Sequence, residues 1–330
     1  LEIFGSIRKR VKAQRETFQA NREEYISVQV SLCAQVASAY INLRELQQEL
    51  QVVMHNCRTQ EEVLNITEVR YKTGLVSNLD VAQAKSVYFS TKASVPQLES
   101  GISQYINSLA ILLGTYPQEI RPTLERIGKL PDYMEPVGVG LPADLLLRRP
   151  DVRQAERLVN AQAALLGASK SDWLPQVFLK GSVGYAARDL KDLTRRKSMT
   201  FEIAPTLSWT LFSGTKLVNA TKQARAQLDE AVHNFNETVL TAVQETDNAM
   251  NNYRNSIKQI VALREVRNQG QETLKLSLEL YKQGLSPFQN VLDALRSLLT
   301  YENQLTQAEG SSLLYLVSLY QALGGGYKEN

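Results

Sequence analysis

The sequence predicts a mainly α-helical fold made of two structural repeats, together with one pair of amphipathic β-strands. The first observation is a motif, Y-K-x-G-L, that occurs at residues 71–75 and again at residues 281–285, which places the two copies 281 − 71 = 210 residues apart. The second is the absence of Gly and Pro from residue 6 to residue 73, and the third is a two-residue hydrophobic alternation between residues 177 and 211. A fixed offset between long segments without helix breakers indicates helical repeats, and the alternation indicates strands.

The first repeat is expected over residues 1–114. A long helix should run to about residue 73, and at 1.5 Å per residue a helix of about 68 residues reaches about 100 Å. The chain should turn at a tip formed by residues 74–79 and return as a second helix over residues 80–113. Leu113-Gly114 suits a left-handed helix end, and the pair recurs as Leu323-Gly324 at the same offset of 210.

Residues 115–142 are expected to form an irregular linker between the repeats, because Pro and Gly are frequent there. The second repeat is expected over residues 143–330. Its first element should be a helix over residues 150–171, which begins at Pro150, a residue favoured in the first helical turn.

A β-hairpin is expected over residues 176–212. Val177, Leu179 and Val183 fall on one face of the first strand, and Phe201, Ile203 and Leu207 fall on one face of the second. Each strand is about ten residues long, which is the length that crosses a bilayer in a tilted barrel.

Aromatic residues near the strand ends favour this membrane interpretation over a soluble hairpin packed on the helices. We expect four of them to form a membrane girdle: Trp173, Tyr185, Phe201 and Trp209. Pro205 counts against regular pairing, because proline inside a paired strand removes a hydrogen bond, and it is expected to mark a bulge or an imperfect pair.

The chain should close with a second long helical hairpin over residues 214–324, whose tip lies at residues 284–289. Only Gly270 interrupts residues 215–283, and apolar residues at spacings of three and four predict a coiled-coil seam. Both hairpins are therefore expected to be antiparallel.

Composition excludes several classes of protein. The net charge is +3 with both signs interleaved, so a nucleic-acid partner is not expected, and no stretch of about 18 apolar residues predicts a membrane-spanning helix. Cys33, Cys57, His55 and His233 form no metal-ligand spacing, and no nucleotide-binding or nucleophile motif occurs. We therefore expect no enzyme activity, no metal site and no cofactor.

Several motifs resemble those of the TolC-like outer-membrane efflux channels, in particular the lipoprotein-type outer-membrane factors of tripartite pumps. The segments are G-L-P-A-D-L-L-L-R-R-P-D-V-R at residues 140–153, P-x-V-x-L-x-G-S-x-G at 175–184, W-x-L-F-x-G at 209–214, and the two Y-K-x-G-L tips. They cover the whole chain.

The resemblance implies a homotrimer in the cell outer membrane with a long periplasmic extension. Each chain would donate four strands to a twelve-stranded barrel and several helices to a long antiparallel α-helical barrel. A periplasmic adaptor protein and an inner-membrane transporter would be its partners, with outer-membrane lipid around the strands. Its function would be a passive exit duct for drugs, metal ions or other small molecules.

The first repeat is expected to be truncated at its N-terminus. If the second repeat starts near Pro142, its counterpart lies at 142 − 210 = −68, so about 70 residues of the first repeat are missing from this sequence. Residues 1–4 would then be the end of a strand equivalent to Leu211-Phe212. A signal peptide and the lipid-bearing cysteine of a lipoprotein cannot be read from this chain.

The resemblance also implies a gate just after the second tip, at Gln289, Asp293 and Arg296, which spacings of four and three place on one helical face. Three copies of Asp293 around a threefold axis would form a carboxylate ring that Arg296 neutralises. The alternative is that Asp293 is an ordinary helix-start acid.

The turn residues are expected to dock the adaptor, with a purely geometric role as the alternative. They are Gly74, Leu75, Val76, Ser77, Gly284, Leu285 and Ser286. For the protein as a whole, the alternative function is a periplasmic coiled-coil adaptor or scaffold without a pore.

Overall fold

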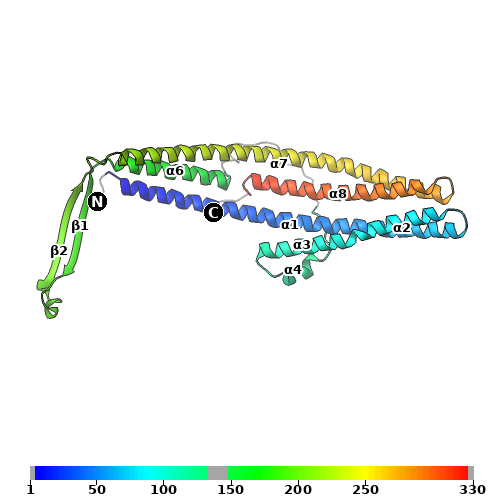
Figure 1. Ribbon diagram of the computed structural model, residues 1–330, viewed down its shortest axis with the longest axis horizontal. Helices are drawn as coiled ribbons and strands as arrows, with labels where there is room; N and C mark the ends of the chain where they lie inside the picture. The colour runs from blue at the N-terminus through cyan, green and yellow to red at the C-terminus, as the bar shows by residue number, and fades with distance from the viewer. Residues whose placement is uncertain (1–3, 132–147, 326–330) are drawn as a thin grey trace. The chain divides into compact units, whose positions relative to one another are not determined.

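A computed structural model describes residues 4–131 and 148–325 of the chain, and most of these residues are helical (Figure 1). The chain divides into two compact units, which are described separately below. The first unit contains residues 1–27 and 143–243, and the second contains residues 28–142 and 244–330. Each unit therefore takes residues from both sequence repeats, and the repeat boundaries at residues 114 and 142 stay a prediction.

The two longest helices have the same length and the same offset as the sequence motifs. Helix α1 spans Ser6–Lys72 and helix α7 spans Lys216–Lys282, each with 67 residues. Each helix is preceded by a glycine in the left-handed region, Gly5 with φ 74° and Gly214 with φ 60°. The offset of 210 residues thus holds for the helices as well as for the motifs.

In the first unit, helix α6, Pro150–Ser171, packs against the N-terminal part of α1. Buried alanines line this contact, including Ala13, Ala20, Ala161, Ala164 and Ala168. Ion pairs flank it: Arg153 binds Glu23 at 3.0 Å, and Arg10 binds Asp172 at 2.8 Å. Small residues allow the helices to approach closely, and the ion pairs fix their antiparallel register.

The strands β1, Gln176–Tyr185, and β2, Met199–Ser208, form a two-stranded antiparallel sheet. The expected hairpin over residues 176–212 is too long, because β2 ends at Ser208 and Trp209, Leu211 and Phe212 follow it. Two short 3-10 helices, η1 at Leu190–Asp192 and η2 at Arg196–Ser198, lie between the strands.

Pro205 does not disturb the pairing, and the expected bulge is absent from this described hairpin. Its partner is Leu179, and the register runs without a slip from Gln176↔Ser208 to Tyr185↔Met199. The amide of Ala186 donates to the carbonyl of Ser198, so these two residues form a hydrogen-bonded pair. Hydrogen-bonded and non-hydrogen-bonded pairs alternate along an antiparallel ladder, and the pair of Leu179 with Pro205 is therefore a non-hydrogen-bonded one. The missing N–H therefore belongs to the outer edge of β2.

In the second unit, the return segment of the first repeat is two helices and not one. Helix α2 spans Asn78–Ala93 and α3 spans Val95–Leu113, with Ser94 between them. Pro96 causes the break, because it has no N–H to bond to the preceding turn. Thr306 stands at the equivalent position of the second repeat, and helix α8 runs unbroken over Phe288–Ala322.

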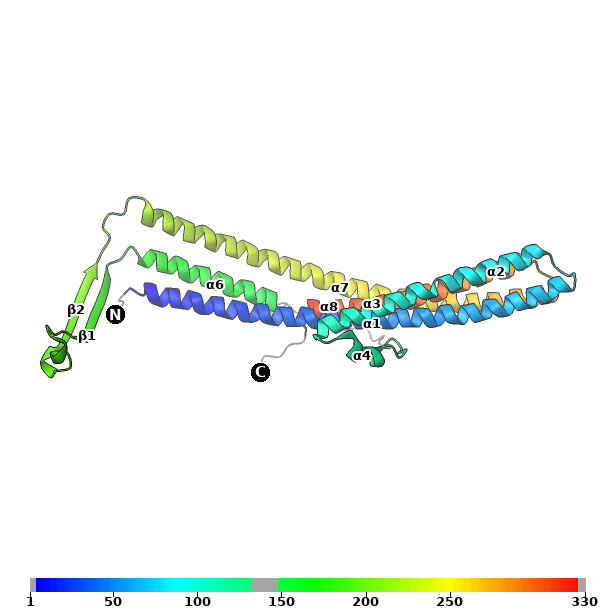
Figure 2. The same ribbon diagram turned by 60° about the horizontal axis from the view of Figure 1, so that its bottom comes forward.

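The expected irregular linker over residues 115–142 contains a short helix, α4, at Pro117–Leu124. Side chains of α1 hold this region in place, since Gln47 donates to the carbonyl of Leu124 and Arg44 to that of Arg126, both at 2.7 Å. Figure 1 and Figure 2 show α4 beside α3. Residues 132–142 of the expected linker lie outside the described residues.

The largest core of the second unit lies where α1 turns into α2 and α7 turns into α8. Its buried members are Val63, Leu64, Val81, Ala84, Val87, Leu274, Tyr281, Phe288, Val291, Leu292, Ala294, Leu295 and Leu298. Each buried leucine contributes about 2 kcal/mol. Packing of four helices, more than the turns themselves, therefore stabilises this end of the unit.

Helix α1 also contains an 18-residue window that is long and apolar enough to cross a membrane, judged by length and composition only. The prediction that the sequence has no candidate for a membrane-spanning helix is therefore too strict. Core helices of soluble proteins pass the same test, so one such window is weak support for a transmembrane helix.

Stability should decrease as the pH rises from about 4.5 to about 7. Glu45 of α1 lies against Gly310 of α8, and burial, with a smaller contribution from the charge of Glu49, raises the pKa of Glu45 from 4.5 to about 7. In this range the folded protein keeps a proton that the unfolded chain releases, so ionisation favours unfolding.

Glu45→Gln should flatten this pH dependence and stabilise the protein at pH 8 by about 1–2 kcal/mol, since the carboxyl keeps some contact with water. Thermal unfolding in detergent between pH 4.5 and 8 measures both effects. Glu62→Gln, at an exposed position of the same helix, controls for the lost charge. An unchanged pH slope in Glu45→Gln would contradict the assignment.

Candidate functional site

The two tips have the same backbone geometry. Gly74 and Gly284 have φ of 76° and 78°. The amides of Leu75 and Leu285 each bond to a carbonyl five residues earlier, Arg70 and Leu280, at 2.9 Å. These bonds are those of a Schellman helix end, which requires a left-handed residue and so favours glycine. A side chain at position 74 would meet no atom within 4 Å, so the dihedral angle and not crowding demands glycine.

The seven predicted docking residues do not all face solvent. Leu75 and Leu285 are 67% and 71% exposed, whereas Val76 packs against the largest core of the second unit. Ser286 accepts a hydrogen bond from Asn290 at 2.9 Å, and Ser77 is the N-cap residue of α2. The apolar surface at the tips therefore belongs to the two leucines, joined by Leu79 at 64% exposure.

Sequence reasoning missed a contact that joins the two tips. The guanidinium of Arg70, at the end of α1, donates to the carbonyls of Tyr281 and Lys282 at 2.7 Å each. These carbonyls lie in the last turn of α7, where helix carbonyls run short of backbone donors, and that of Tyr281 also accepts the amide of Gly284 at 2.9 Å. The guanidinium also lies 4.6 Å from the centre of the Tyr281 ring, and burial raises the pKa of the Tyr281 phenol. We name this contact the Arg70 clasp.

The three predicted gate residues share one exposed face of α8. Gln289, Asp293 and Arg296 are exposed, while Leu292 and Leu295 of the opposite face are in the core. Asp293 also lines a groove between α7 and α8, opposite Glu265, Gln269 and Thr273.

The structure changes one expectation about the gate. Asp293 accepts a hydrogen bond from the side-chain amide of Gln289 at 3.0 Å, one helical turn away. Among the described residues no ion pair joins Asp293 to Arg296, so Arg296 does not neutralise Asp293 within one chain.

The four predicted girdle residues lie in two groups at opposite ends of the hairpin. The indole of Trp209 donates to the carbonyl of Trp173 at 3.2 Å, and the indole of Trp173 donates to the hydroxyl of Thr221 on α7 at 3.0 Å. Tyr185 and Phe201 lie toward the other end, near the loop between the strands. Apolar side chains along both strands are exposed, with Leu179 at 51%, Val183 at 74%, Phe201 at 72%, Ile203 at 64% and Leu207 at 67%.

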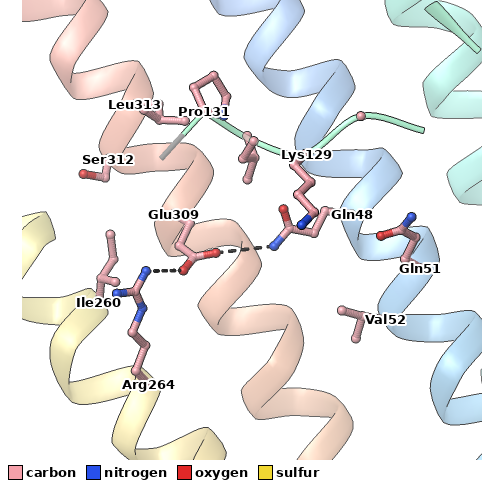
Figure 3. A pocket seen from close by; sticks show the side chains of 12 residues that line it. Gln48, Gln51, Val52, Lys129, Pro131, Ile260, Arg264, Glu309, Ser312 and Leu313 are labelled. Carbon is pink, nitrogen blue, oxygen red and sulfur yellow. Dashed lines mark hydrogen bonds and ion pairs between the residues drawn. The ribbon is translucent and has the colours of Figure 1, made fainter. Parts of the chain in front are cut away.

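A cavity of about 470 Å³ lies between α1, α7 and α8, next to residues 128–131 (Figure 3). At its wall, Arg264 of α7 binds Glu309 of α8 at 3.0 Å, and Gln48 of α1 donates to the same carboxylate at 3.4 Å. No residue predicted from the sequence as functional lies there. In the part of the chain that the structure describes, no group of three or more His, Cys, Asp or Glu residues could hold a metal ion.

Comparisons with known proteins agree on one family. The model of the family described as outer membrane efflux protein matches residues 1–115 and 141–325. The antibiotic efflux pump outer membrane protein ArpC of Pseudomonas putida is 30% identical over 330 residues, which cover 100% of this chain and 68% of ArpC. The cation efflux system protein CusC of Escherichia coli O6:H1 is 27% identical over 338 residues, which cover 100% of this chain and 71% of CusC.

The fold is also that of a solved channel. The structure of the outer-membrane channel OprN is similar to this one with a TM-score of 0.93 and 30% sequence identity. The similarity covers 99% of this chain and 74% of the OprN chain.

Proposed function

The chain belongs to the outer membrane efflux protein family, and we propose that three copies of it assemble into the exit duct of a tripartite efflux system. The protein is an outer-membrane efflux channel subunit with a long periplasmic helical part. The resemblance to TolC-like channels that the motifs indicated is confirmed. The alternative, an adaptor without a pore, is not supported, because the similar proteins are outer-membrane channel proteins.

The observation that carries the proposed assembly is that the hairpin, with its exposed apolar face, has two unpaired edges. Among the described residues, β1 and β2 pair only with each other, so each strand has an edge of unpaired backbone groups. Such edges are not tolerated in lipid, where every backbone N–H and C=O must be bonded within the protein. Strands of further hairpins must therefore complete the sheet, and a closed barrel shared by three chains meets this requirement.

The proposed partners meet the duct at the tips. A periplasmic adaptor would dock on the exposed leucines, and an inner-membrane transporter would supply the energy and select the substrate. ArpC is named for an antibiotic pump and CusC for a cation efflux system. Because similar ducts serve such different substrates, we propose that this chain is a passive conduit that performs no catalysis.

The protein should be extracted only with detergent and should be a trimer in it, because its lipid-facing strands cannot close a barrel within one chain. Light scattering on the detergent complex measures the mass, and planar-bilayer recordings measure conductance. Refolded protein that stays monomeric and soluble without detergent would refute the channel assembly.

Replacing Leu75 and Leu285 together with serine should abolish most export while the trimer still forms, because both side chains are exposed and outside the core. Loss of two apolar anchors from a docking interface costs about 2–4 kcal/mol, a 30-fold or greater loss of affinity. Export in a strain without its own channel is the measurement.

The matched control is the double change of the same leucines to methionine, which keeps an apolar side chain at each tip. It should retain export. Full export by the serine variant at equal protein level would show that the two leucines only shape the turns.

A further inference from the structure

The loop between the two strands carries an excess of positive charge. The loop is bounded by Ala186 and Ser198, which are joined by a backbone hydrogen bond, and it contains five basic residues and two acidic ones. The basic residues are Arg188, Lys191, Arg195, Arg196 and Lys197, and the acidic ones are Asp189 and Asp192. The net charge of this loop is therefore 5 − 2 = +3, as large as that of the whole chain.

Four of these cations are available to a partner. Arg188, Lys191, Arg196 and Lys197 are exposed, and in the part of the chain that the structure describes none of them forms an ion pair or a side-chain hydrogen bond. We name these four residues the loop cations.

Apolar side chains accompany the loop cations. Leu190 is 91% exposed and Leu193 is 40% exposed, and both lie in the segment that contains η1. A surface that is both cationic and apolar is suited to the boundary between lipid headgroups and acyl chains, where each kind of side chain finds its own environment. An ordinary solvated loop gains nothing from exposed leucines.

The hairpin places this loop at a membrane surface. Its two tryptophans, tied to α7 through Thr221, mark the end near the helices. Strands of ten residues rise about 33 Å, or about 23 Å across the membrane at a tilt of about 45°, which matches the apolar band of a membrane barrel. The loop therefore lies at the opposite interface, which is the outer one if the helices are periplasmic.

From this placement we propose that the loop cations bind phosphate groups of outer-leaflet lipids and anchor the rim of the barrel to the membrane. Guanidinium and ammonium groups form charge-assisted hydrogen bonds with phosphate, and a cation near an anionic membrane surface strengthens binding about fivefold. The exposed leucines would insert beside the same headgroups. The inference rests on the proposed channel function, because it requires the hairpin to span the membrane.

The test uses the full-length protein in detergent, with lipid retention measured by native mass spectrometry. The probes are lipid A, which carries phosphate monoesters, phosphatidylcholine as the zwitterionic lipid, and inorganic phosphate alone. The loop variant changes Arg188, Lys191, Arg196 and Lys197 to Gln. The matched control changes four exposed helix cations to Gln: Arg58, Arg254, Lys258 and Lys275.

The parent and the helix control should retain lipid A over phosphatidylcholine, and the loop variant should retain it at least 100-fold more weakly, with retention falling as salt increases. Equal retention by all three proteins would overturn the proposal. Binding of inorganic phosphate without preference for lipid A would also overturn it, because the loop would then be a free-anion site.

Conductance of the same preparations separates this inference from the proposed function. A parent protein that forms no channels would refute the exit duct, whatever lipid it retains. A loop variant that conducts normally and loses lipid A supports the anchor. A loop variant that retains lipid A and changes only anion conductance would show that the loop cations act at the pore mouth, and this result would overturn the proposal.

Discussion

Replacing Arg70 with alanine should release the end of α7 from α1 at the tips. The substitution removes two hydrogen bonds from a charged donor to the carbonyls of Tyr281 and Lys282, and it leaves both carbonyls without that partner. Bonds of this kind contribute about 1.5–3 kcal/mol each, so the free energy of local opening should decrease by about 3 kcal/mol. Amides near residue 285 should then exchange about 100-fold faster in hydrogen exchange measured by mass spectrometry.

Two variants make this experiment specific. Arg58→Ala removes an exposed arginine of the same helix and should leave the exchange unchanged. Arg70→Lys keeps the charge but not the planar pair of donors, and should give an intermediate rate. If the amides of Arg70→Ala exchanged at the rate of the parent, the Arg70 clasp would contribute nothing to the stability of the tips. The largest core of the second unit would then stabilise them alone.

Replacing Asp293 with asparagine should lower the preference of the channel for cations about tenfold. In the proposed trimer, three Asp293 carboxylates surround the axis. A cation about 6 Å from each gains about 2 kcal/mol in water, before salt reduces the effect. Asparagine keeps an oxygen that can accept the Gln289 hydrogen bond, so the variant removes the charge and preserves the helix face.

Planar-bilayer recordings under a salt gradient give the cation-to-anion permeability ratio. Arg296→Gln should raise this ratio, because Arg296 has no ion-pair partner among the described residues of its own chain and adds positive charge to the same face. Equal ratios in the parent and in Asp293→Asn would return Asp293 to the role of a helix-start acid.

Local rules predicted the elements whose causes are local. Gly74 and Gly284 are predicted as turns because glycine occupies the left-handed region at the lowest cost, and both do occupy it. The break at Ser94 had an equally local signal in Pro96, but the repeated motifs favoured one continuous helix as in the second repeat. The difference between repeats was therefore present in the sequence and was outweighed by their similarity.

Contacts between distant segments could not be predicted in this way. The Arg70 clasp joins residues 211 positions apart in the sequence, and nothing in the pattern of either helix specifies it. Glu45 and Gly310 meet for the same reason, since an acid on α1 becomes half-buried only when α8 packs beside it. The family resemblance gave the fold class and the function, and the gate and docking residues taken from it stay predictions.

The equal lengths of α1 and α7 restrict how this protein can change during evolution. A single inserted residue advances a helix by 1.5 Å and rotates all later side chains by about 100°. An insertion in α1 alone, ahead of the tip, would turn Arg70 away from the carbonyls at the end of α7. Insertions and deletions should therefore survive only as matched pairs, one in each 67-residue helix, and most readily in steps of seven residues, which restore the original face.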